Sequence, residues 1–200
     1  MRLTEIFKTT QGLAVMLLSL VLSGPTWAAP DAVAGKLKAQ LCVSCHGAEG
    51  ISSMAGTPHL AAQPPLSVFY QLIQFRNQQR KSDAMQAIAA NMSDQDMRDI
   101  AAWYASLPAP PAHSGSETAL LERGQQIAQQ QFCASCHGAK LEGQKHVPRL
   151  AGQASDYFTQ QLKNFRSGER AGMDGTMASA ARSLTDEEIQ AMAIYSRSLP

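Results

Sequence analysis

All four cysteines of this 200-residue sequence lie in two copies of one short motif, Cys-x-x-Cys-His. The two thiols of a copy lie one helical turn apart, where they can form thioethers with the two vinyl groups of a haem. The adjacent imidazole can bind the iron of the same haem, so the motif is typical of covalent c-type haem attachment. The predicted thioether cysteines are Cys42, Cys45, Cys133 and Cys136, and the predicted iron-binding histidines are His46 and His137.

Two other uses of paired cysteines are less favoured by the sequence. Zinc could use the four cysteines and two histidines, but each motif alone supplies three ligands at an awkward spacing, and no further cysteine completes either site. A thioredoxin-like redox pair needs a βαβ context, which the sequence lacks. Two motif copies at matching positions therefore favour haem over both alternatives.

The motif belongs to a longer internal repeat. Residues 58–63, with the pattern Pro-x-Leu-Ala-x-Gln, recur as residues 148–153, and the segment 93–108 is matched by 185–200. These blocks occur in the same order in both halves, which predicts two copies of one domain. Domains this small bury a limited core, and a large bound cofactor would help to fill it.

Methionine is the expected second iron ligand in an electron-transfer haem protein, and the repeat selects among the candidates. Met85 and Met177 each lie eight residues before a predicted helix cap, and no other methionines occupy equivalent positions in the two copies. The main competitor in the second copy is Met173, which has no counterpart, and an unpaired methionine more often fills a gap in a core. The remaining histidines are expected at the surface, since none has a histidine counterpart: His59, His113 and His146.

The first residues are predicted to form a signal peptide. Arg2 and Lys8 precede a ten-residue apolar run, and small residues follow it, as in a secretory signal peptide cleaved after Ala28. The run is shorter than the about 20 residues that a spanning helix needs, so no transmembrane anchor is expected after residues 1–28 are removed. An uncleaved anchor is the alternative. Export implies an oxidising compartment, where thiols consumed as thioethers cannot cross-oxidise.

The composition is that of a globular protein, with 44% hydrophobic and 16% charged residues. A formal net charge of +1, with no basic stripe, argues against a nucleic-acid partner.

Local patterns predict an all-α protein with two domains. Segments beginning Ser93-Asp94-Gln95-Asp96 and Thr185-Asp186-Glu187-Glu188 resemble capping boxes that start helices. Further helices are expected over about 32–41, 68–76, 118–131 and 157–166, and no stretch alternates convincingly enough for a strand. The prolines and small polar residues of 109–116 predict an extended linker, which places the domains at residues 29–108 and 117–200.

On these motifs, the chain resembles the di-haem cytochrome c4 family, built of tandem class I c-type cytochrome domains. The resemblance covers essentially all of the predicted mature chain and implies two helical domains, each with one covalent haem c. It also implies that the backbone carbonyls of Pro58 and Pro148 accept hydrogen bonds from the rings of His46 and His137. Such a bond would orient the imidazole and tune its donation to iron.

The resemblance further implies a close contact between the first and last helices of each domain. Gly35 and Gly124 lie seven and nine residues before their cysteines and would allow this approach. The expected partners on the last helices are Trp103 and Tyr195.

One difference between the copies predicts unequal haems. The resemblance implies that Tyr157 donates a hydrogen bond to a haem propionate, whereas the equivalent residue of the first copy is Ser67. The two haems are therefore expected to differ in reduction potential.

His/Met ligation fills both axial positions of an iron, which suits one-electron transfer and leaves little room for oxygen or peroxide. The expected function is therefore that of a periplasmic electron shuttle. By resemblance, it would take electrons from a cytochrome bc complex or a dehydrogenase and pass them to a terminal oxidase or reductase. Two alternatives stay open: a fixed cytochrome subunit of a larger dehydrogenase complex, and an enzyme such as a peroxidase or a sulfur-oxidising cytochrome with one weakly ligated iron.

Overall fold

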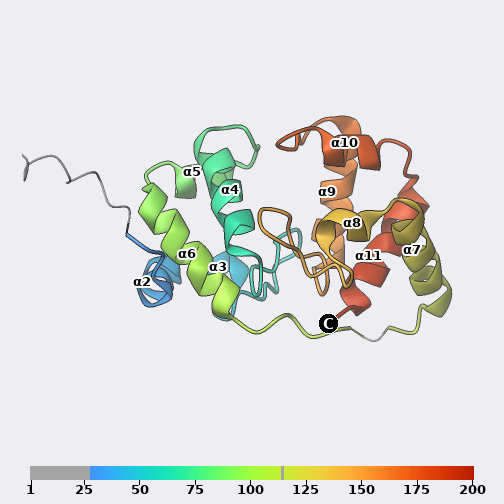
Figure 1. Ribbon diagram of the computed structural model, residues 1–200, viewed down its shortest axis with the longest axis horizontal. Helices are drawn as coiled ribbons and strands as arrows, with labels where there is room; N and C mark the ends of the chain where they lie inside the picture. Colours follow the sequence, from blue (N-terminus) through green and yellow to red (C-terminus); the bar gives the residue numbers. More distant parts are fainter. Residues whose placement is uncertain (1–27, 114) are drawn as a thin grey trace, which may run out of the picture.

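The computed structural model describes residues 28–113 and 115–200, so the predicted signal peptide lies outside the described residues except for Ala28. Within the described ranges the chain forms helices and no strand, with one isolated bridge between Gln144 and Val147. The all-α prediction is confirmed. Figure 1 shows two helical lobes side by side, joined by an extended segment along one edge. No helix in the described part of the chain is long and apolar enough to cross a membrane.

The first lobe contains the N-terminal haem motif. Its elements are α2 (Ala32–Lys38), the 3-10 helix η1 (Ala39–Cys42), α3 (Val43–His46), α4 (Pro65–Arg76), α5 (Asp83–Ala89) and α6 (Asp94–Ser106).

The second lobe repeats this order. Its elements are α7 (Thr118–Gln130), α8 (Cys133–His137), α9 (Ser155–Ser167), α10 (Thr176–Ala181) and α11 (Asp186–Ser198).

Both predicted capping boxes are present. The Ser93 hydroxyl accepts from the backbone of Asp96, and Thr185 accepts from Glu188, with the reciprocal carboxylate bonds also formed. The helix α4 begins at Pro65, earlier than expected, because proline suits the first helical turn. The short helices α5 and α10 were not expected from the sequence, because seven or six residues are too few to show a period.

In each lobe the first helix crosses the last at a glycine. A Cβ at Gly35 would lie 1.9 Å from the carbonyl oxygen of Asp99 in α6, and one at Gly124 would lie 2.2 Å from that of Ala191 in α11. Only a residue without a side chain allows this approach. Tyr195 contacts Gly124 as expected. At Gly35 the three nearest atoms belong to the backbone of Asp99 and Ile100, and the expected contact with Trp103 stays a prediction.

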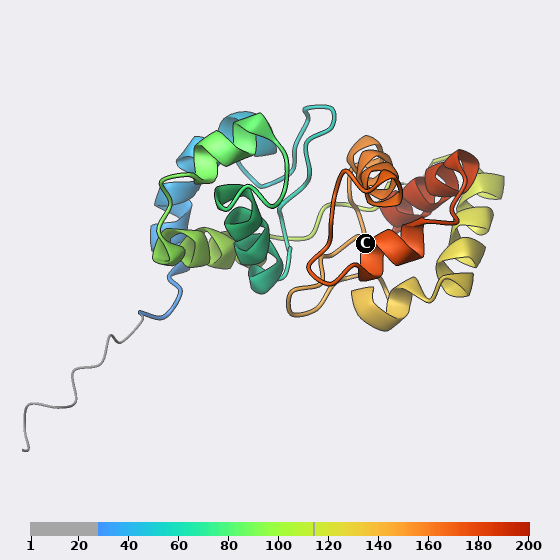
Figure 2. The ribbon, with the colours of Figure 1, turned by 90° about the horizontal axis from the view of Figure 1, so that it is seen from above.

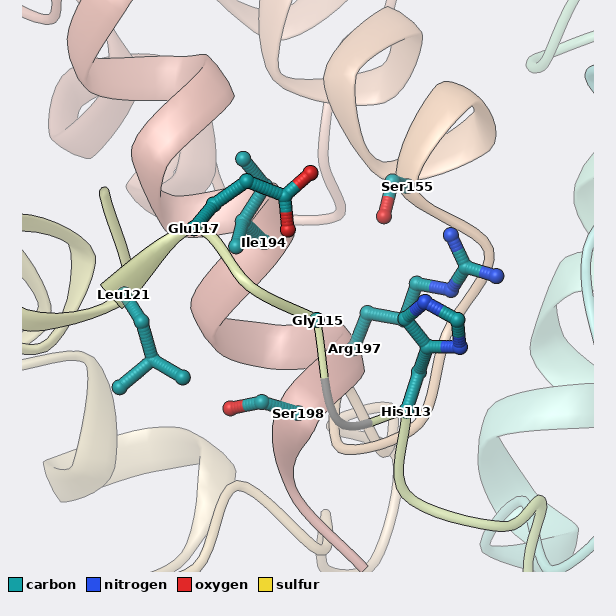
Figure 3. A pocket seen from close by; sticks show the side chains of 8 residues that line it. All are labelled: His113, Gly115, Glu117, Leu121, Ser155, Ile194, Arg197 and Ser198. Atoms are coloured by element: carbon teal, nitrogen blue, oxygen red, sulfur yellow. The ribbon is translucent and has the colours of Figure 1, made fainter. Parts of the chain in front are cut away.

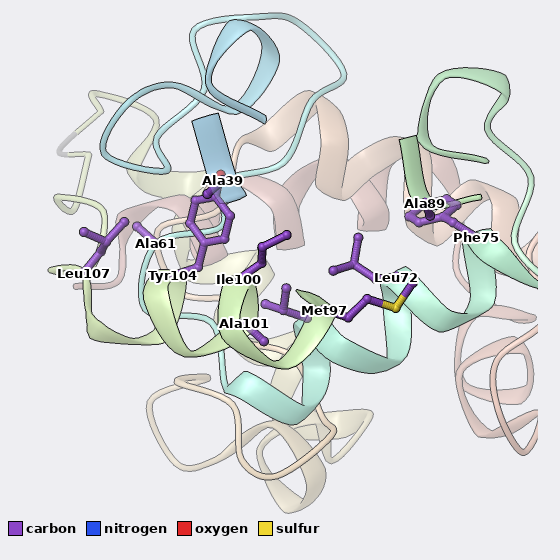
Figure 4. Close-up of a cluster of buried hydrophobic side chains, with 11 residues drawn as sticks. Ala39, Ala61, Leu72, Phe75, Ala89, Met97, Ile100, Ala101, Tyr104 and Leu107 are labelled. Atoms are coloured by element: carbon purple, nitrogen blue, oxygen red, sulfur yellow. The ribbon is translucent and has the colours of Figure 1, made fainter. Parts of the chain in front are cut away.

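Each lobe has its own hydrophobic core. In the first, α4 and α6 pack together through fully buried side chains that include Met97, Ile100 and Tyr104 (Figure 4). In the second, Ile127 of α7 and Ile189 of α11 take part in the equivalent cluster. Two separate cores support the division into two domains.

The connecting segment runs over the second lobe as an extended chain. The backbone N–H of His113 donates to the carbonyl oxygen of Arg197 over 3.0 Å. Beside this contact, residues of the segment and of α7, α9 and α11 line a small polar cavity of about 50 Å³ (Figure 3). None of the predicted haem ligands lines this cavity, so it is not a candidate haem site.

The loops that follow the two haem motifs lie between the lobes in both views (Figures 1 and 2). Hydrogen bonds cross from one lobe to the other here, such as the 2.6 Å bond from the backbone N–H of Gly56 to Asp156. The face that each lobe turns toward the other is therefore the one that carries the proline of its Pro-x-Leu-Ala-x-Gln segment.

Candidate haem sites and the interface between them

The histidine of the first motif is held in one orientation. His46 ends α3, is 6% exposed, and has its ring Nδ1 3.0 Å from the carbonyl oxygen of Pro58. Burial lowers the pKa of His46, against the opposing effect of the Pro58 carbonyl, and so favours the neutral ring. A carbonyl can only accept, so Nδ1 carries the proton and Nε2 keeps a free lone pair. That nitrogen is available to bind a metal.

The second motif repeats this arrangement. His137 ends α8, is 5% exposed, and places Nδ1 2.8 Å from the carbonyl oxygen of Pro148. Burial again lowers the pKa of the ring. Both hydrogen bonds implied by the family resemblance are therefore present in the structure.

The loop after each motif returns the proline to the histidine. Gly47 has a φ of +79°, and a Cβ there would lie 2.2 Å from the carbonyl oxygen of Ile51. Farther along, the carbonyl of Gly50 accepts from the backbone of Leu60 over 2.7 Å, which closes the loop. Leu141 and Leu150 make the equivalent 2.8 Å bond in the second lobe. These backbone contacts set where the two proline carbonyls lie.

The four cysteines lie at two levels of burial. Cys42 and Cys133 are partly buried and pack against the cores, whereas Cys45 and Cys136 are exposed. Burial raises the pKa of Cys42 and of Cys133. Each motif thus has one partly buried and one exposed cysteine beside a buried imidazole, and this donor set fits a covalently bound haem.

Met85 and Met177 occupy equivalent places. They lie on the short helices α5 and α10, are partly buried, and pack against the same cores as Cys42 and Cys133 respectively. The competitor Met173 is 58% exposed.

Zinc finds no ready site in the part of the chain that the structure describes. No group of three or more His, Cys, Asp or Glu side chains lies close enough there to hold a metal ion. The structure therefore adds no support to the zinc alternative.

Tyr157 lies in a polar cluster between the lobes. Its hydroxyl oxygen accepts from Nη2 of Arg80 over 2.8 Å, and that guanidinium also donates to Gln71 and Gln161. Arg170 donates to the same two glutamines. Burial would raise the pKa of Tyr157, but the positive charges of Arg80 and Arg170 outweigh it and hold that pKa below its usual value.

The two arginines were missed by the sequence reasoning, although the repeat places them at equivalent positions. Burial, assisted by the nearby charge of Arg80, lowers the pKa of Arg170 to about 10. Each guanidinium lies over the phenylalanine of its own lobe, Arg80 at 4.6 Å from Phe75 and Arg170 at 4.5 Å from Phe165. The cluster concentrates positive charge at the lobe interface, which fits anionic groups such as the carboxylates of haem.

The expected surface position of His59 was wrong. Its ring is half-buried and its Nδ1 accepts from the backbone N–H of Ser52 over 3.0 Å. The equivalent residue, Arg149, is 9% exposed and donates to the carbonyl oxygens of Ala151 and Pro200. At both positions the backbone is hydrogen-bonded to a glutamine of the opposite lobe, a neighbour that a single repeat does not reveal.

The chain is similar to known c-type cytochromes in each half and over its whole length. Residues 121–200 match the family described as cytochrome c, and residues 29–103 match the family described as cytochrome c oxidase, cbb3-type, subunit III. Cytochrome c4 of Pseudomonas aeruginosa is 35% identical over 196 residues, which cover 94% of this chain and 98% of that protein. A thiosulfate dehydrogenase electron acceptor from Stutzerimonas stutzeri is 35% identical over 168 residues, which cover 78% of each chain.

The fold is also similar to that of a solved cytochrome c4 structure. The crystal structure of reduced recombinant cytochrome c4 from Pseudomonas stutzeri has a TM-score of 0.80 and 30% identity, and the match covers 86% of this chain and all of that one. Similarity over nearly the full length, two haem motifs and two cytochrome domains lead to one conclusion. The chain belongs to the cytochrome c4 family of electron carriers, which hold one covalently attached haem c in each of two domains.

Proposed function

We propose that this protein carries single electrons in the periplasm, between a respiratory donor and a terminal oxidase or reductase. The donor would be a cytochrome bc complex or a dehydrogenase. The observation that carries the proposal is the repeated imidazole–carbonyl pair, at 3.0 Å in one lobe and 2.8 Å in the other, in two lobes that contact directly. Two equivalent redox centres in one molecule suit a carrier that accepts an electron at one end and releases it at the other.

The first lobe, residues 29–108, would hold one haem. Cys42 and Cys45 would form its thioethers, and Nε2 of His46 and the sulfur of Met85 would bind its iron. Bound in this way, the haem supplies a one-electron iron couple with both axial positions filled. The proton held on Nδ1 of His46 and the shared packing of Cys42 and Met85 against one core support this ligand set.

The second lobe, residues 117–200 after the linker 109–116, would hold the other haem. Cys133 and Cys136 would be its thioether residues, and His137 and Met177 its iron ligands. Met177 packs against the same core as Cys133. The 58% exposure of Met173 disfavours it as a ligand, because a thioether bound to iron in a core must leave solvent.

Tyr157 would contribute to the environment of a haem propionate. The phenol lies beside Arg80 and Arg170, whose positive charges support an anionic ligand at this place. In the first lobe the equivalent residue is Ser67, which is buried and has no ring to offer. This difference supports unequal haem potentials.

Partner docking would be brief and small. The residues directly before the two motifs, Leu41 and Phe132, are apolar and exposed by 48% and 75%. Electron-transfer encounters bury less than about 1,200 Å², so small apolar surfaces beside the motifs are sufficient. The predicted signal peptide, residues 1–28, supports a periplasmic location.

The test is to reconstitute the electron path with purified components. The holoprotein should be reduced by a quinol-fed cytochrome bc complex or a dehydrogenase, and reoxidised by membranes that contain a terminal oxidase, at rates that rise with its concentration. Failure of both half-reactions, with two haems in place, would contradict the proposed path.

A second function is favoured by one relative. Because the similar Stutzerimonas stutzeri protein is named as an electron acceptor of thiosulfate dehydrogenase, this chain could instead serve one dehydrogenase as a fixed subunit. Co-purification with a dehydrogenase at constant stoichiometry through several columns would favour that role. Purification as a separate protein that both partner classes oxidise and reduce would favour the shuttle.

A further inference from the structure

Two glutamines, one in each lobe, bind the backbone of the opposite lobe. The side-chain amide of Gln63 donates to the carbonyl oxygen of Arg149 over 2.9 Å and accepts from its backbone N–H over 3.0 Å. Gln153 makes the same pair of bonds with His59, at 3.0 and 2.8 Å. The glutamines are only 7% and 5% exposed, so water competes little for these bonds.

In the first lobe, the bond from Gln153 ends on the peptide group that also holds the candidate axial histidine. The carbonyl of Pro58 and the N–H of His59 belong to one planar peptide unit. The carbonyl accepts from Nδ1 of His46 over 3.0 Å, and the N–H donates to Oε1 of Gln153 over 2.8 Å. A hydrogen-bond chain therefore runs from His46 through one peptide group to a residue of the other lobe.

The second lobe contains the equivalent hydrogen-bond chain. The peptide between Pro148 and Arg149 accepts from Nδ1 of His137 over 2.8 Å and donates to Oε1 of Gln63 over 3.0 Å. Each histidine is thus linked through a single peptide group to the glutamine of the opposite lobe.

Hydrogen bonds in such a chain strengthen one another. A peptide N–H that donates to a glutamine oxygen makes its own carbonyl a better acceptor, because the peptide is a conjugated unit. The carbonyl then draws the Nδ1 proton more strongly, and the imidazole gains electron density at Nε2. A more basic axial ligand stabilises ferric iron and lowers the reduction potential.

We propose that Gln153 tunes the reduction potential of the haem in the first lobe, and that Gln63 tunes that of the haem in the second. The inference rests on the proposed binding of iron by His46 and His137. Both glutamines are positioning residues, which act through a peptide group and a histidine. The potential of each haem accordingly depends on contact with the opposite lobe.

A purely structural clamp would behave differently. Gln63 and Gln153 each make two interface bonds of similar length, so either loss would weaken the interface similarly and would affect both haems in the same way. Electronic tuning predicts a crossed pattern instead, in which each substitution acts on the haem of the other lobe.

The experiment compares Gln153→Met with Gln63→Met in the full-length holoprotein. Each variant removes the same pair of interface bonds without adding charge, so each serves as the control of the other. Gln153→Met also removes the 3.0 Å bond that Oε1 accepts from the backbone N–H of Ala154 in its own lobe. Redox titrations would be followed by NMR of the two iron-bound methionine methyl groups, which report the two haems separately. In Gln153→Met, the ratio of reduced to oxidised iron in the first lobe should rise about threefold at fixed potential, a shift of about 28 mV at 59 mV per tenfold. The reduction potential of the second haem should not change in this variant. In Gln63→Met, the second haem should show the same shift and the first should stay unchanged.

Equal shifts of both haems in both variants, or no shift in either, would overturn the tuning. The imidazole Nδ1–H resonances of the reduced protein give a second readout, in which His46 alone should respond to Gln153→Met and His137 alone to Gln63→Met. Where a methionine variant does not accumulate, Gln→Asn at the same position keeps a polar side chain one methylene too short to reach, and the same crossed pattern is expected. A preparation with fewer than two haems would contradict the ligand assignment, whereas two haems without crossed shifts would contradict the tuning alone.

Discussion

The two lobes fasten their first helix to their last in different ways. In the first lobe, Lys38 of α2 forms ion pairs with Asp99 and Asp96 of α6, at 2.6 and 2.7 Å. The Asp99 side chain is 4% exposed and also accepts from the backbone N–H of Asp31 and from Gln95. The first lobe therefore depends on a buried carboxylate.

The second lobe has an alanine at the corresponding place. Gly124 packs on the carbonyl of Ala191 as Gly35 packs on that of Asp99. The ion pair between the helices is instead that of Arg123 with Glu188, at 2.9 Å, with side chains 48% and 25% exposed. One crossing geometry thus tolerates either a buried charge network or an apolar contact with a surface ion pair, and the glycine is what the two share.

The largest expected effect is loss of that shared glycine. Gly35→Val and Gly124→Val should each lower the free energy of unfolding of the holoprotein by about 3 kcal/mol, because the new side chain meets backbone that cannot turn aside. Thermal unfolding followed by circular dichroism measures this. Gly172→Ala is the control, since its nearest contact is an ordinary 3.8 Å and its stability should not change. Tolerance of either valine would show that the helices do not approach this closely.

The next largest effect distinguishes the two lobes by the stability that their helix-to-helix ion pairs contribute. Asp99→Ala should cost about 3 kcal/mol, because it leaves the backbone N–H of Asp31, the side-chain amide of Gln95 and part of the Lys38 charge without their acceptor. Arg123→Met, which breaks the more exposed pair of the second lobe, should cost less than about 1 kcal/mol. Chemical denaturation of both variants in parallel tests the difference. Equal costs would mean that burial of Asp99 contributes nothing.

Much of this architecture could be predicted from the sequence, because it depends on contacts between residues that are close along the chain. Capping boxes and haem motifs are contacts between near neighbours. A few residues of sequence are therefore enough to predict the pairs Ser93 with Asp96 and Cys42 with His46. The bonds of Gln63 and Gln153 join a side chain to the backbone of a residue far along the chain. A backbone acceptor places no demand on the side chain there, which is histidine in one lobe and arginine in the other, so no residue pattern revealed the contact.

Acid should distinguish the two lobes by a smaller effect, a loss of stability in the first lobe. The hydrogen bond from Lys38 holds the pKa of Asp96 at about 2, and Asp99, despite burial that opposes it, also has a lowered pKa. A carboxyl with a depressed folded pKa adds stability above its unfolded pKa, and this is lost as pH falls through the folded value. The first lobe should therefore loosen between about pH 4 and pH 2.

Trp103, in α6, reports on the first lobe alone, and the only other tryptophan, Trp27, lies in the predicted signal peptide. As pH falls, the fluorescence of Trp103 should rise at a higher pH than that at which the helical signal of the whole mature protein decreases. In Asp99→Asn the first lobe should loosen at a higher pH. Coincident transitions at every pH would contradict the difference between the lobes.

The smallest expected effect concerns the two potentials. Titration of the native protein should resolve two one-electron steps, because Tyr157 has only Ser67 as its counterpart. Tyr157→Phe makes the lobes more alike and should bring the steps closer, by about 1 kcal/mol or less per electron. An unchanged separation would remove the phenol from the haem environment.

The central claim is that each lobe holds iron between an imidazole and a methionine sulfur. The thioether-to-iron charge-transfer band of the oxidised protein measures this directly, recorded per polypeptide for the native protein, Met85→Ala, Met177→Ala and the double variant. Each single variant should lose half of the native intensity, and the double variant should lose all of it. Full intensity in either single variant would contradict the ligand assignment for that lobe.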